Sequence, residues 1–308
     1  AKQSHIFRDE PEIASSPRLG LLAMTENFMN NKTKRIGIDA RFYGPVGKGL
    51  GRYTQEVVDN IIRLDQANQY VVFLRQENFS DFQCDGVRVK KVLADIQWYG
   101  LAEQIIMPYY IWRERLDLMH FPHFNVPIFC PVKFVVTIHD LILIKFPTLR
   151  ASTLSPLIYK IKNLAYKLVI TAAVKRAKKV LAVSQFTKND VIKQFKIKLD
   201  KVVVTYEGVV VTYEGVAELT PQNPPFKGGL KDYLLYVGNA YPHKNLEGLI
   251  RAYAEIEKEI KNLNLVLVGK EDYFYNRLKQ TAKNYSSDII FPGFVPDSEL
   301  AALYQNAT

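Results

Sequence analysis

Glycines ahead of a helical segment are the first residues in this sequence that suggest chemistry. Gly47, Gly49 and Gly51 occur in GPVGKGLGRYTQEV (44–57), after a short apolar run. Glycines at the start of a helix let the backbone approach a phosphate, and the free N–H groups of the first turn attract anions. Neither common phosphate signature fits, because Lys48 is not followed by Ser or Thr and the GxGxG spacing differs from the dinucleotide fingerprint. The alternative is a flexible surface loop.

A histidine and an aspartate follow an apolar run in VVTIHDLIL (135–143). His139 and Asp140 are therefore predicted at the carboxyl end of a buried strand, the edge where α/β sheets bind ligands. A single histidine is more often structural, and that is the prediction for His120 and His123. For His139 the catalytic and the structural interpretations both stay open.

A lysine precedes a helical pattern in LLYVGNAYPHKNLEGLIRAY (234–253). A strand is predicted to end at Gly238, and a helix begins near Asn245, directly after Lys244. A cation at a helix N-terminus is unfavourable unless an anion joins it, so this arrangement predicts a diphosphate site. The alternative is a solvated lysine.

Apolar strands alternate with helical patterns along the chain, which predicts parallel sheets with helices on both faces. The expected strands are 35–40, 69–75, 87–92, 116–121, 133–139, 178–184, 201–206, 233–238, 263–269 and 288–293. The expected helices are 51–64, 98–115 with an interruption at Pro108, 155–178, a helix from the cap Ser184 to about Phe195, 245–260, 272–284, and a last helix capped by Asp297.

The organisation predicted from this pattern is α/β, with two doubly wound, Rossmann-like domains that face each other across a cleft. The segments are a disordered N-terminal extension (1–33), a first Rossmann-like domain (34–218), a linker rich in Pro and Gly (219–232), and a second Rossmann-like domain (233–308).

The composition narrows the class of protein. The chain has 308 residues, a formal net charge of +10 and two cysteines without a CxxC pair. The charge favours anionic partners, and the cysteine usage favours a reduced, cytoplasmic chain. No apolar run is long enough to span a membrane. Basic residues without interleaved aromatics, and the lack of a nucleic-acid motif, argue against nucleic acid as a partner.

Seven segments in order resemble the retaining GT-B glycosyltransferases of family four (glycosyl transferases group 1), and in particular the bacterial surface-polysaccharide branch. They are RIGIDARFYGPVGKGLGRYTQE, HFPHFNVP, VVTIHDL, VLAVSQFTKNDVIKQF, YVGNAYPHKNLEGLIRAY, LVLVGK and IIFPGFVPDSELAALYQNA. The resemblance runs from about Arg35 to the end of the chain and implies the GT-B fold. It also implies that 34–218 is the N-terminal, acceptor-side domain and that 233–308 is a truncated C-terminal, nucleotide-sugar-binding domain.

The resemblance also implies roles for individual residues. His139 matches the histidine beside the transferred sugar, and Lys244 matches the lysine that binds the donor diphosphate. The other implied donor-binding residues are Gly49, Gly51, Gly238, Asn239, His243, Phe294 and Val295, and the implied acceptor-side residues are Arg52 and Asp140. One departure weakens the match: Asn239 stands where the family usually has arginine.

The implied activity is transfer of a hexose, for which this branch suggests mannose, from a GDP- or UDP-linked donor to a glycan or lipid-linked acceptor. No Asp-x-Asp is present, so no cofactor and no metal are expected, and Lys244 would supply the positive charge. The family's pair of glutamates is not present before Thr308, which suggests a C-terminally truncated protein. The alternative is a non-catalytic GT-B fragment or pseudoenzyme that binds nucleotide weakly or not at all. An oxidoreductase is disfavoured by the failed dinucleotide fingerprint.

No acidic residue lies between Asp140 and Asp190. One interpretation of helix 155–179 is a packed helix with a solvated basic side, whose apolar stripe is Leu157, Ile161, Leu164, Leu168 and Ala172. The favoured one is attraction to an anionic membrane surface, which would make the protein peripheral on the inner face of the plasma membrane.

A seven-residue repeat, VVVTYEG, occupies 202–208 and again 209–215. Because seven is odd, one continuous strand would turn the second copy's side chains to the opposite face. Only one copy is therefore expected in the buried strand, and the first copy is preferred.

Overall fold

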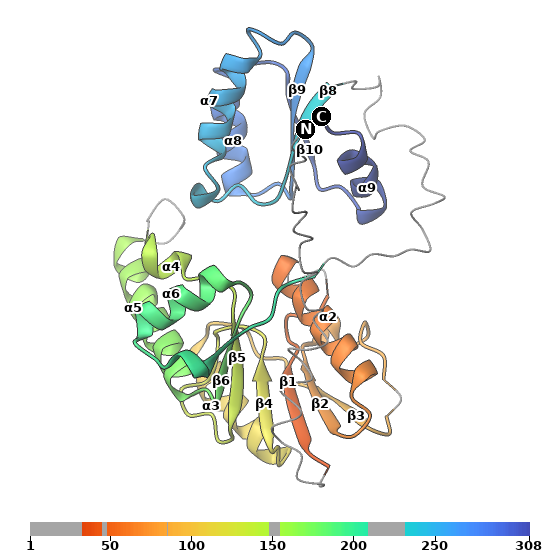
Figure 1. Cartoon of the computed structure of the whole chain (residues 1–308), viewed down its shortest axis with the longest axis vertical. Helices are drawn as coiled ribbons and strands as arrows, with labels where there is room; N and C mark the ends of the chain where they lie inside the picture. The colour runs from red at the N-terminus through yellow and green to blue at the C-terminus, as the bar shows by residue number, and fades with distance from the viewer. Residues whose placement is uncertain (1–32, 45–47, 85, 148–154, 209–231) are drawn as a thin grey trace, which may run out of the picture. The chain divides into compact units, whose positions relative to one another are not determined.

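The computed structural model describes residues 33–44, 48–84, 86–147, 155–208 and 232–308 (Figure 1). The chain divides into two compact units, Ala1–Pro147 with Lys160–Val209, and Thr148–Tyr159 with Val210–Thr308. The predicted extension, apart from its last residue, and the predicted linker, apart from Asp232, lie outside the described residues.

The first unit is built on a seven-stranded parallel sheet in the order β3-β2-β1-β4-β5-β6-β7. Its strands are β1 (Arg35–Asp39), β2 (Gln69–Leu74), β3 (Val89–Leu93), β4 (Leu118–Phe121), β5 (Phe134–Ile138), β6 (Lys179–Ala182) and β7 (Val202–Val204). Its helices are α2 (Lys48–Leu64), α3 (Leu101–Arg113), α4 (Ile142–Lys145), α5 (Pro156–Arg176) and α6 (Gln185–Phe195). The continuous apolar runs form strands that are buried on both faces, as parallel sheets require.

Helices cover both faces of this sheet. The crossover through α2 leads outward from β1 to β2, whereas those through α3 and α5 lead in the opposite direction across the sheet. Right-handed crossovers therefore place α2 on one face and α3 and α5 on the other. The packing agrees: Val58 of α2 lies in one core cluster, and Met107 of α3 and Ile170 of α5 lie together in another.

Some expected helix boundaries were wrong. α2 begins at Lys48 rather than at Gly51. α3 is continuous through Pro108, since burial of Met107 and Ile111 outweighs the one backbone hydrogen bond that proline cannot make. The predicted Ser184 cap is confirmed, because its side chain accepts a hydrogen bond from the Thr187 backbone N–H.

The second unit contains a three-stranded parallel sheet in the order β10-β9-β8. Its elements are β8 (Asp232–Val237), α7 (Leu246–Ile256), β9 (Leu263–Val268), α8 (Tyr273–Ala282), β10 (Ile289–Gly293) and α9 (Asp297–Gln305). The N-cap of α9 is Pro296, so the predicted Asp297 cap was wrong by one residue. Parallel strands alternating with helices in both units confirm the α/β, doubly wound class.

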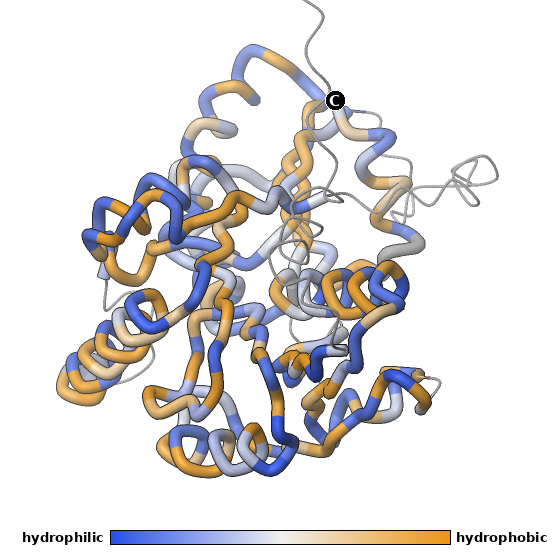
Figure 2. Tube along the Cα trace, turned by 60° about the horizontal axis from the view of Figure 1, so that its bottom comes forward, coloured by the Kyte–Doolittle hydropathy of each residue, from blue (hydrophilic) through white to orange (hydrophobic). Residues whose placement is uncertain are grey.

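The first copy of the VVVTYEG repeat supplies β7, which pairs with β6. That prediction is confirmed, and the second copy lies outside the described residues. Hydrophobic residues (orange in Figure 2) lie along the strands and also on the helices. Within the described part of the chain, none of the helices combines the length and apolarity needed to cross a bilayer.

Candidate functional site

His139 lies directly after β5, and both of its ring nitrogens face an acceptor. Nε2 is 2.9 Å from the carbonyl oxygen of Pro122, and Nδ1 is 3.0 Å from Oε1 of Glu207. A carbonyl oxygen can only accept, so Nε2 carries a proton. An ionised carboxylate also only accepts, so Nδ1 forms a hydrogen bond with Glu207 when it too carries a proton.

Tyr53 and Thr137 hold this ring in place. The Tyr53 ring, from α2, meets His139 edge-to-face with the centroids 4.6 Å apart. The Tyr53 hydroxyl is 3.2 Å from Oγ1 of Thr137, which lies 3.1 Å from Nε2 of His120. Burial raises the pKa of Tyr53 to about 12, so its hydroxyl is neutral at physiological pH. The carboxyl end of β5 thus presents one histidine in a fixed orientation.

Glu207 is the movable partner of this pair. Its side chain is half exposed, and the hydrogen bond from His139 lowers its pKa. In the tautomer without a proton on Nδ1, Nε2–H still donates to the Pro122 carbonyl oxygen, and Nδ1 presents a lone pair once Glu207 no longer contacts it. The histidine can then accept a hydrogen bond from a hydroxyl group of a ligand.

The sequence interpretation missed Glu207 and Tyr53. Glu207 follows β7 closely, and the carboxyl ends of parallel strands share one edge, so its position was a usable signal. Tyr53 gives no comparable signal, because the helical pattern does not show which strand end it meets.

The glycines of α2 have different surroundings. A Cβ atom added to Gly51 would lie 2.0 Å from the carbonyl oxygen of Gly44, so this glycine lets the helix pack on the preceding turn. A Cβ atom at Gly49 would meet nothing within 4 Å. Arg52 is exposed on α2. Asp140 Oδ1 accepts from the backbone N–H of Ile142 at 2.9 Å, which stabilises the turn into α4.

A buried charged network underlies the same edge of the sheet. Both carboxylate oxygens of Asp39 accept from Arg41, at 2.8 and 2.7 Å. Arg41 also pairs with Glu103, whose carboxylate accepts two 2.6 Å contacts from the Asn125 amide. Burial raises the pKa of Glu103. The network ties the end of β1 to α3.

The two other histidines of this region are buried and neutral. Burial lowers the pKa of His120 to about 4 and that of His123 to about 3. His123 packs between aromatic rings, with centroids 4.0 Å from Phe124 and 5.6 Å from Phe42. His120 is satisfied by Thr137, as expected for a structural histidine, whereas Nδ1 of His123 is buried without a hydrogen-bond partner among the described residues.

In the second unit, the predicted donor loop follows β8. The Gly238 N–H donates to Val268 O at 3.0 Å, and the Tyr275 hydroxyl donates to Gly238 O at 2.8 Å. Oδ1 of Asn239 is buried and has no hydrogen-bond partner among the described residues. An acceptor of this kind is suited to a donor on a bound ligand.

Lys244 lies one residue before Asn245, which adopts a left-handed conformation and caps α7. Its side chain is exposed, and no group in the described ranges forms a hydrogen bond or ion pair with its ammonium. The neighbouring His243 is exposed, with its ring 5.9 Å from that of Tyr241. This leaves a cation beside the first turn of a helix, a suitable place for an anion.

The last two residues predicted to bind the sugar donor differ in burial. Phe294 is exposed, whereas Val295 is buried in the core cluster with Tyr233 and Val266. Among the described residues no group of three or more His, Cys, Asp and Glu side chains is arranged to hold a metal ion. The structure thus groups His139 with Glu207 and Tyr53 in one unit, and Gly238, Asn239, His243 and Lys244 in the other.

Known proteins resemble this chain in both sequence and fold. The chain matches O-antigen chain mannosyltransferase B of Escherichia coli at 29% identity over 136 residues, 42% of this chain and 36% of that protein's length. Anabaena HepE, solved with UDP and glucose, superimposes with a TM-score of 0.54 at 17% identity, covering 88% of this chain and 72% of HepE. WaaG, a glycosyltransferase of lipopolysaccharide biosynthesis, superimposes with a TM-score of 0.58 at 14% identity, covering 87% of this chain and 72% of WaaG.

Two family models cover most of the described chain. "Glycosyltransferase Family 4" matches residues 47–213, more than half of the chain, and "Glycosyl transferases group 1" matches residues 222–308. The solved structures at low identity support the fold alone. The chain therefore belongs to glycosyltransferase family 4, in glycosyl transferases group 1, and its two doubly wound units have the GT-B fold.

Proposed function

We propose that this protein transfers a hexose, mannose, from a nucleoside-diphosphate sugar to a hydroxyl of a glycan or lipid-linked acceptor. The observation that carries the proposal is the ring of His139, which is fixed through Nε2 while Nδ1 faces a displaceable carboxylate. Family membership supports the reaction class. The similarity to an O-antigen mannosyltransferase supports the sugar.

In this reaction the bond between the anomeric carbon and the diphosphate breaks, and a bond from that carbon to the acceptor oxygen forms. The acceptor hydroxyl gives its proton to the phosphate oxygen that leaves the anomeric carbon, and the electron pair of the broken bond adds negative charge to the departing nucleoside diphosphate. Fixed cations and N–H groups directed at that charge lower the barrier. We assign this role to Lys244 and the first turn of α7, and we propose that Asn239 Oδ1 accepts a hydrogen bond from the bound donor.

His139 is assigned to the sugar itself. In the free protein Glu207 occupies Nδ1. A sugar hydroxyl that displaces Glu207 would donate to the freed Nδ1, because Nε2–H stays bonded to Pro122. His139 thereby orients the sugar rather than supplying a proton to the leaving group.

Retention at the anomeric carbon and independence from metal complete the proposal. We do not assign either nearby carboxylate to a covalent intermediate, because Glu207 is half exposed and pairs with the ring, and Asp140 accepts from the backbone N–H of Ile142. Attack by the acceptor on the face from which the diphosphate leaves is consistent with that. Lys244 would supply the charge that a divalent cation provides in enzymes with an Asp-x-Asp motif, which this sequence lacks.

A second candidate is a GT-B protein that binds nucleotide weakly or not at all. It is favoured by Asn239, because an uncharged amide stands where the family usually places an arginine. Binding of the sugar donor distinguishes the two candidate functions, because only the transferase should bind it well. Such binding is measurable, since a ligand that binds the native state raises the melting temperature.

The experiment measures the affinity of the purified chain for GDP, UDP, GDP-mannose and UDP-glucose by calorimetry and thermal shift, with and without EDTA. We expect binding to at least one of these that EDTA leaves unchanged. Lys244→Ala should weaken it about tenfold or more, which is about 1.4 kcal/mol. Lys261→Ala, at an exposed lysine in the turn between α7 and β9, is the control and should bind as the wild type does.

Transfer is then followed with labelled GDP-mannose and a lipid-linked oligosaccharide. His139→Ala should lower the transfer rate while leaving the affinity for the nucleoside diphosphate unchanged, because it contacts the sugar. If no nucleotide binds, the second candidate stands. Equal transfer by wild type and His139→Ala would remove the histidine from the mechanism.

A further inference from the structure

α3 is apolar on the side that faces away from the sheet as well as on the side that packs against it. Met107 and Ile111 are buried against the sheet. The opposite side presents four large side chains, 54% to 87% exposed: Leu101, Ile105, Tyr109 and Trp112. Their spacing places all four on one side of the helix. A helix with two apolar sides is normally covered on both.

α5 repeats this arrangement on the same face of the sheet. Its buried side is formed by Ile170, Ala173 and Val174. Ile161, Leu164 and Leu168 lie on the opposite side and are 58% to 61% exposed. The packed-helix interpretation of this stripe was therefore wrong, because a different side of α5 contacts the sheet.

The segment 122–132 connects the two helices at the surface. The backbone N–H of Ile128 donates to the Gln104 side chain of α3 at 2.9 Å, and Arg176 of α5 donates to Cys130 O at 3.3 Å. Between these two attachments Phe129 is 80% exposed. We call the exposed apolar residues on the outer sides of α3 and α5, together with Phe129, the α3–α5 face.

The charges around the α3–α5 face are positive. The one acidic residue of α3, Glu103, is buried, and neither segment 122–132 nor α5 contains an acid. The exposed cations on the two helices are Arg113, Lys160, Lys162, Lys167, Lys175 and Arg176. An apolar surface with cations and without exposed acids fits an anionic lipid surface.

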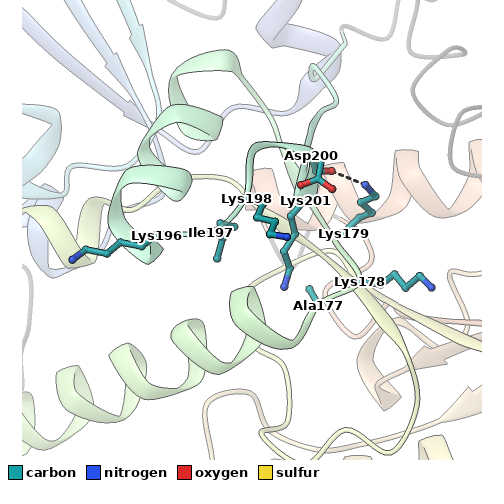
Figure 3. Close-up of a pocket in the computed structure, with 8 residues that line it drawn as sticks. All are labelled: Ala177, Lys178, Lys179, Lys196, Ile197, Lys198, Asp200 and Lys201. Atoms are coloured by element: carbon teal, nitrogen blue, oxygen red, sulfur yellow. Dashed lines mark hydrogen bonds between the residues drawn. The ribbon is translucent and has the colours of Figure 1, made fainter.

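A lysine-lined hollow of about 400 Å³ continues the basic surface beyond the C-terminal end of α5 (Figure 3). One acidic residue, Asp200, lines it together with five lysines: Lys178, Lys179, Lys196, Lys198 and Lys201. Backbone carbonyl oxygens fix two of these ammonium groups. Lys179 Nζ donates to Asp200 O at 2.5 Å, and Lys201 Nζ donates to Lys175 O at 2.6 Å. The hollow suits the phosphate groups of lipid heads.

We propose that the α3–α5 face docks the protein on an anionic bilayer, with the apolar side chains among the acyl chains and the lysines on the headgroup phosphates. Trp112 and Tyr109 are the side-chain types that settle at the boundary between headgroups and acyl chains. A second copy of the chain is a poor occupant, because a symmetric pairing would bring these cations against themselves. The net charge of +10 also repels a second copy of the chain and attracts an anionic bilayer.

Vesicle sedimentation tests the proposal with phosphatidylcholine vesicles that contain or lack 30% phosphatidylglycerol, at about 0.05 and 0.5 M salt. We expect the chain to sediment with the anionic vesicles alone, and less at high salt. Leu164→Asp and the pair Lys160→Glu/Lys167→Glu should each weaken binding at least tenfold. Leu64→Asp, an exposed leucine at the end of α2 on the other face of the sheet, and Lys261→Glu are the matched controls and should bind as wild type.

Trp112 gives a second readout that does not depend on these variants. Its fluorescence should shift to shorter wavelength on anionic vesicles and be quenched by brominated acyl chains, and both signals should disappear in Trp112→Phe. Equal binding to neutral vesicles, binding unaffected by Leu164→Asp, or unquenched Trp112 in bound protein would each overturn the proposal. So would a dimer in gel filtration that Leu164→Asp dissociates, since a second copy would then cover the face. No sugar nucleotide is present, so the outcome is independent of the proposed reaction.

Discussion

Arg41 is the residue whose loss should cost the first unit most. Its side chain is fully buried, as is that of Glu103, and the Asp39 side chain is 6% exposed. One guanidinium therefore compensates two carboxylates that water does not reach. In Arg41→Met both carboxylates stay buried without a cation.

Removing one partner of a buried ion pair typically costs about 3–5 kcal/mol, because the remaining charge is left uncompensated. For a unit of about this size each kcal/mol lowers the melting temperature by about 2–4 °C. We therefore expect Arg41→Met to melt about 6–20 °C below wild type. Adding Glu103→Gln removes one of the two stranded charges and leaves an acceptor for Asn125, so the double variant should regain about 1 kcal/mol or more.

Both tryptophans of the chain, Trp98 and Trp112, lie in the first unit, so tryptophan fluorescence follows the unfolding of that unit. Melting is compared with Arg63→Met, an exposed arginine at the end of α2 that should change little. The difference in melting temperature between wild type and Arg41→Met should become smaller as the pH falls from 8 to 5. Burial raises the pKa of Glu103, so the folded variant takes up a proton before the unfolded chain does. A melting temperature within 2 °C of wild type would refute the reasoning.

Two further predictions use the same fluorescence readout. Gly51→Ala should destabilise the first unit by about 1–3 kcal/mol, because the added Cβ would overlap the Gly44 carbonyl oxygen. Gly49→Ala places its Cβ in open space and should be neutral or stabilising. Equal effects of the two substitutions would show that the start of α2 shifts to accommodate a Cβ at Gly51. Acid should destabilise wild type, since the pKa of His123 is lowered to about 3 and the unfolded chain takes up this proton first, below about pH 6.5. The unfolding free energy of wild type should fall with pH between pH 6 and 5, and His123→Phe should make this fall smaller by about 1.4 kcal/mol per pH unit. The same fall in wild type and variant would mean that His123 titrates in the folded protein as it does in the unfolded chain.

Much of the architecture could be predicted from local patterns. The apolar runs at 134–138 and 179–182 are long enough for strands and too short for helices, so the parallel α/β class followed from spacing alone. The Ser184 cap needs only a hydroxyl three residues before an amide, which is also local. His139 and Lys244 were found because strand ends and helix starts can be located in the sequence.

The pairings that decide the site were not local. Glu207 reaches His139 across 68 residues, and Arg41 reaches Glu103 across 62. Residue spacing shows that each is charged, but not which partner the fold supplies. Gly51 had two interpretations in the sequence, a phosphate approach or a flexible surface loop. The structure adds a third, since a Cβ atom there would lie 2.0 Å from the Gly44 carbonyl oxygen, which makes Gly51 a packing contact.

Short-range sequence pattern is enough to indicate the family, the order of strands and helices along the chain, and the strand and helix ends where candidate residues lie. The side of each helix that meets the sheet depends on packing between distant segments, so it is visible only in the folded protein. Helical periodicity identifies an apolar stripe on α5 but does not show whether the stripe packs or faces solvent. The sheet contacts Ile170 and Val174, so Ile161, Leu164 and Leu168 are left exposed.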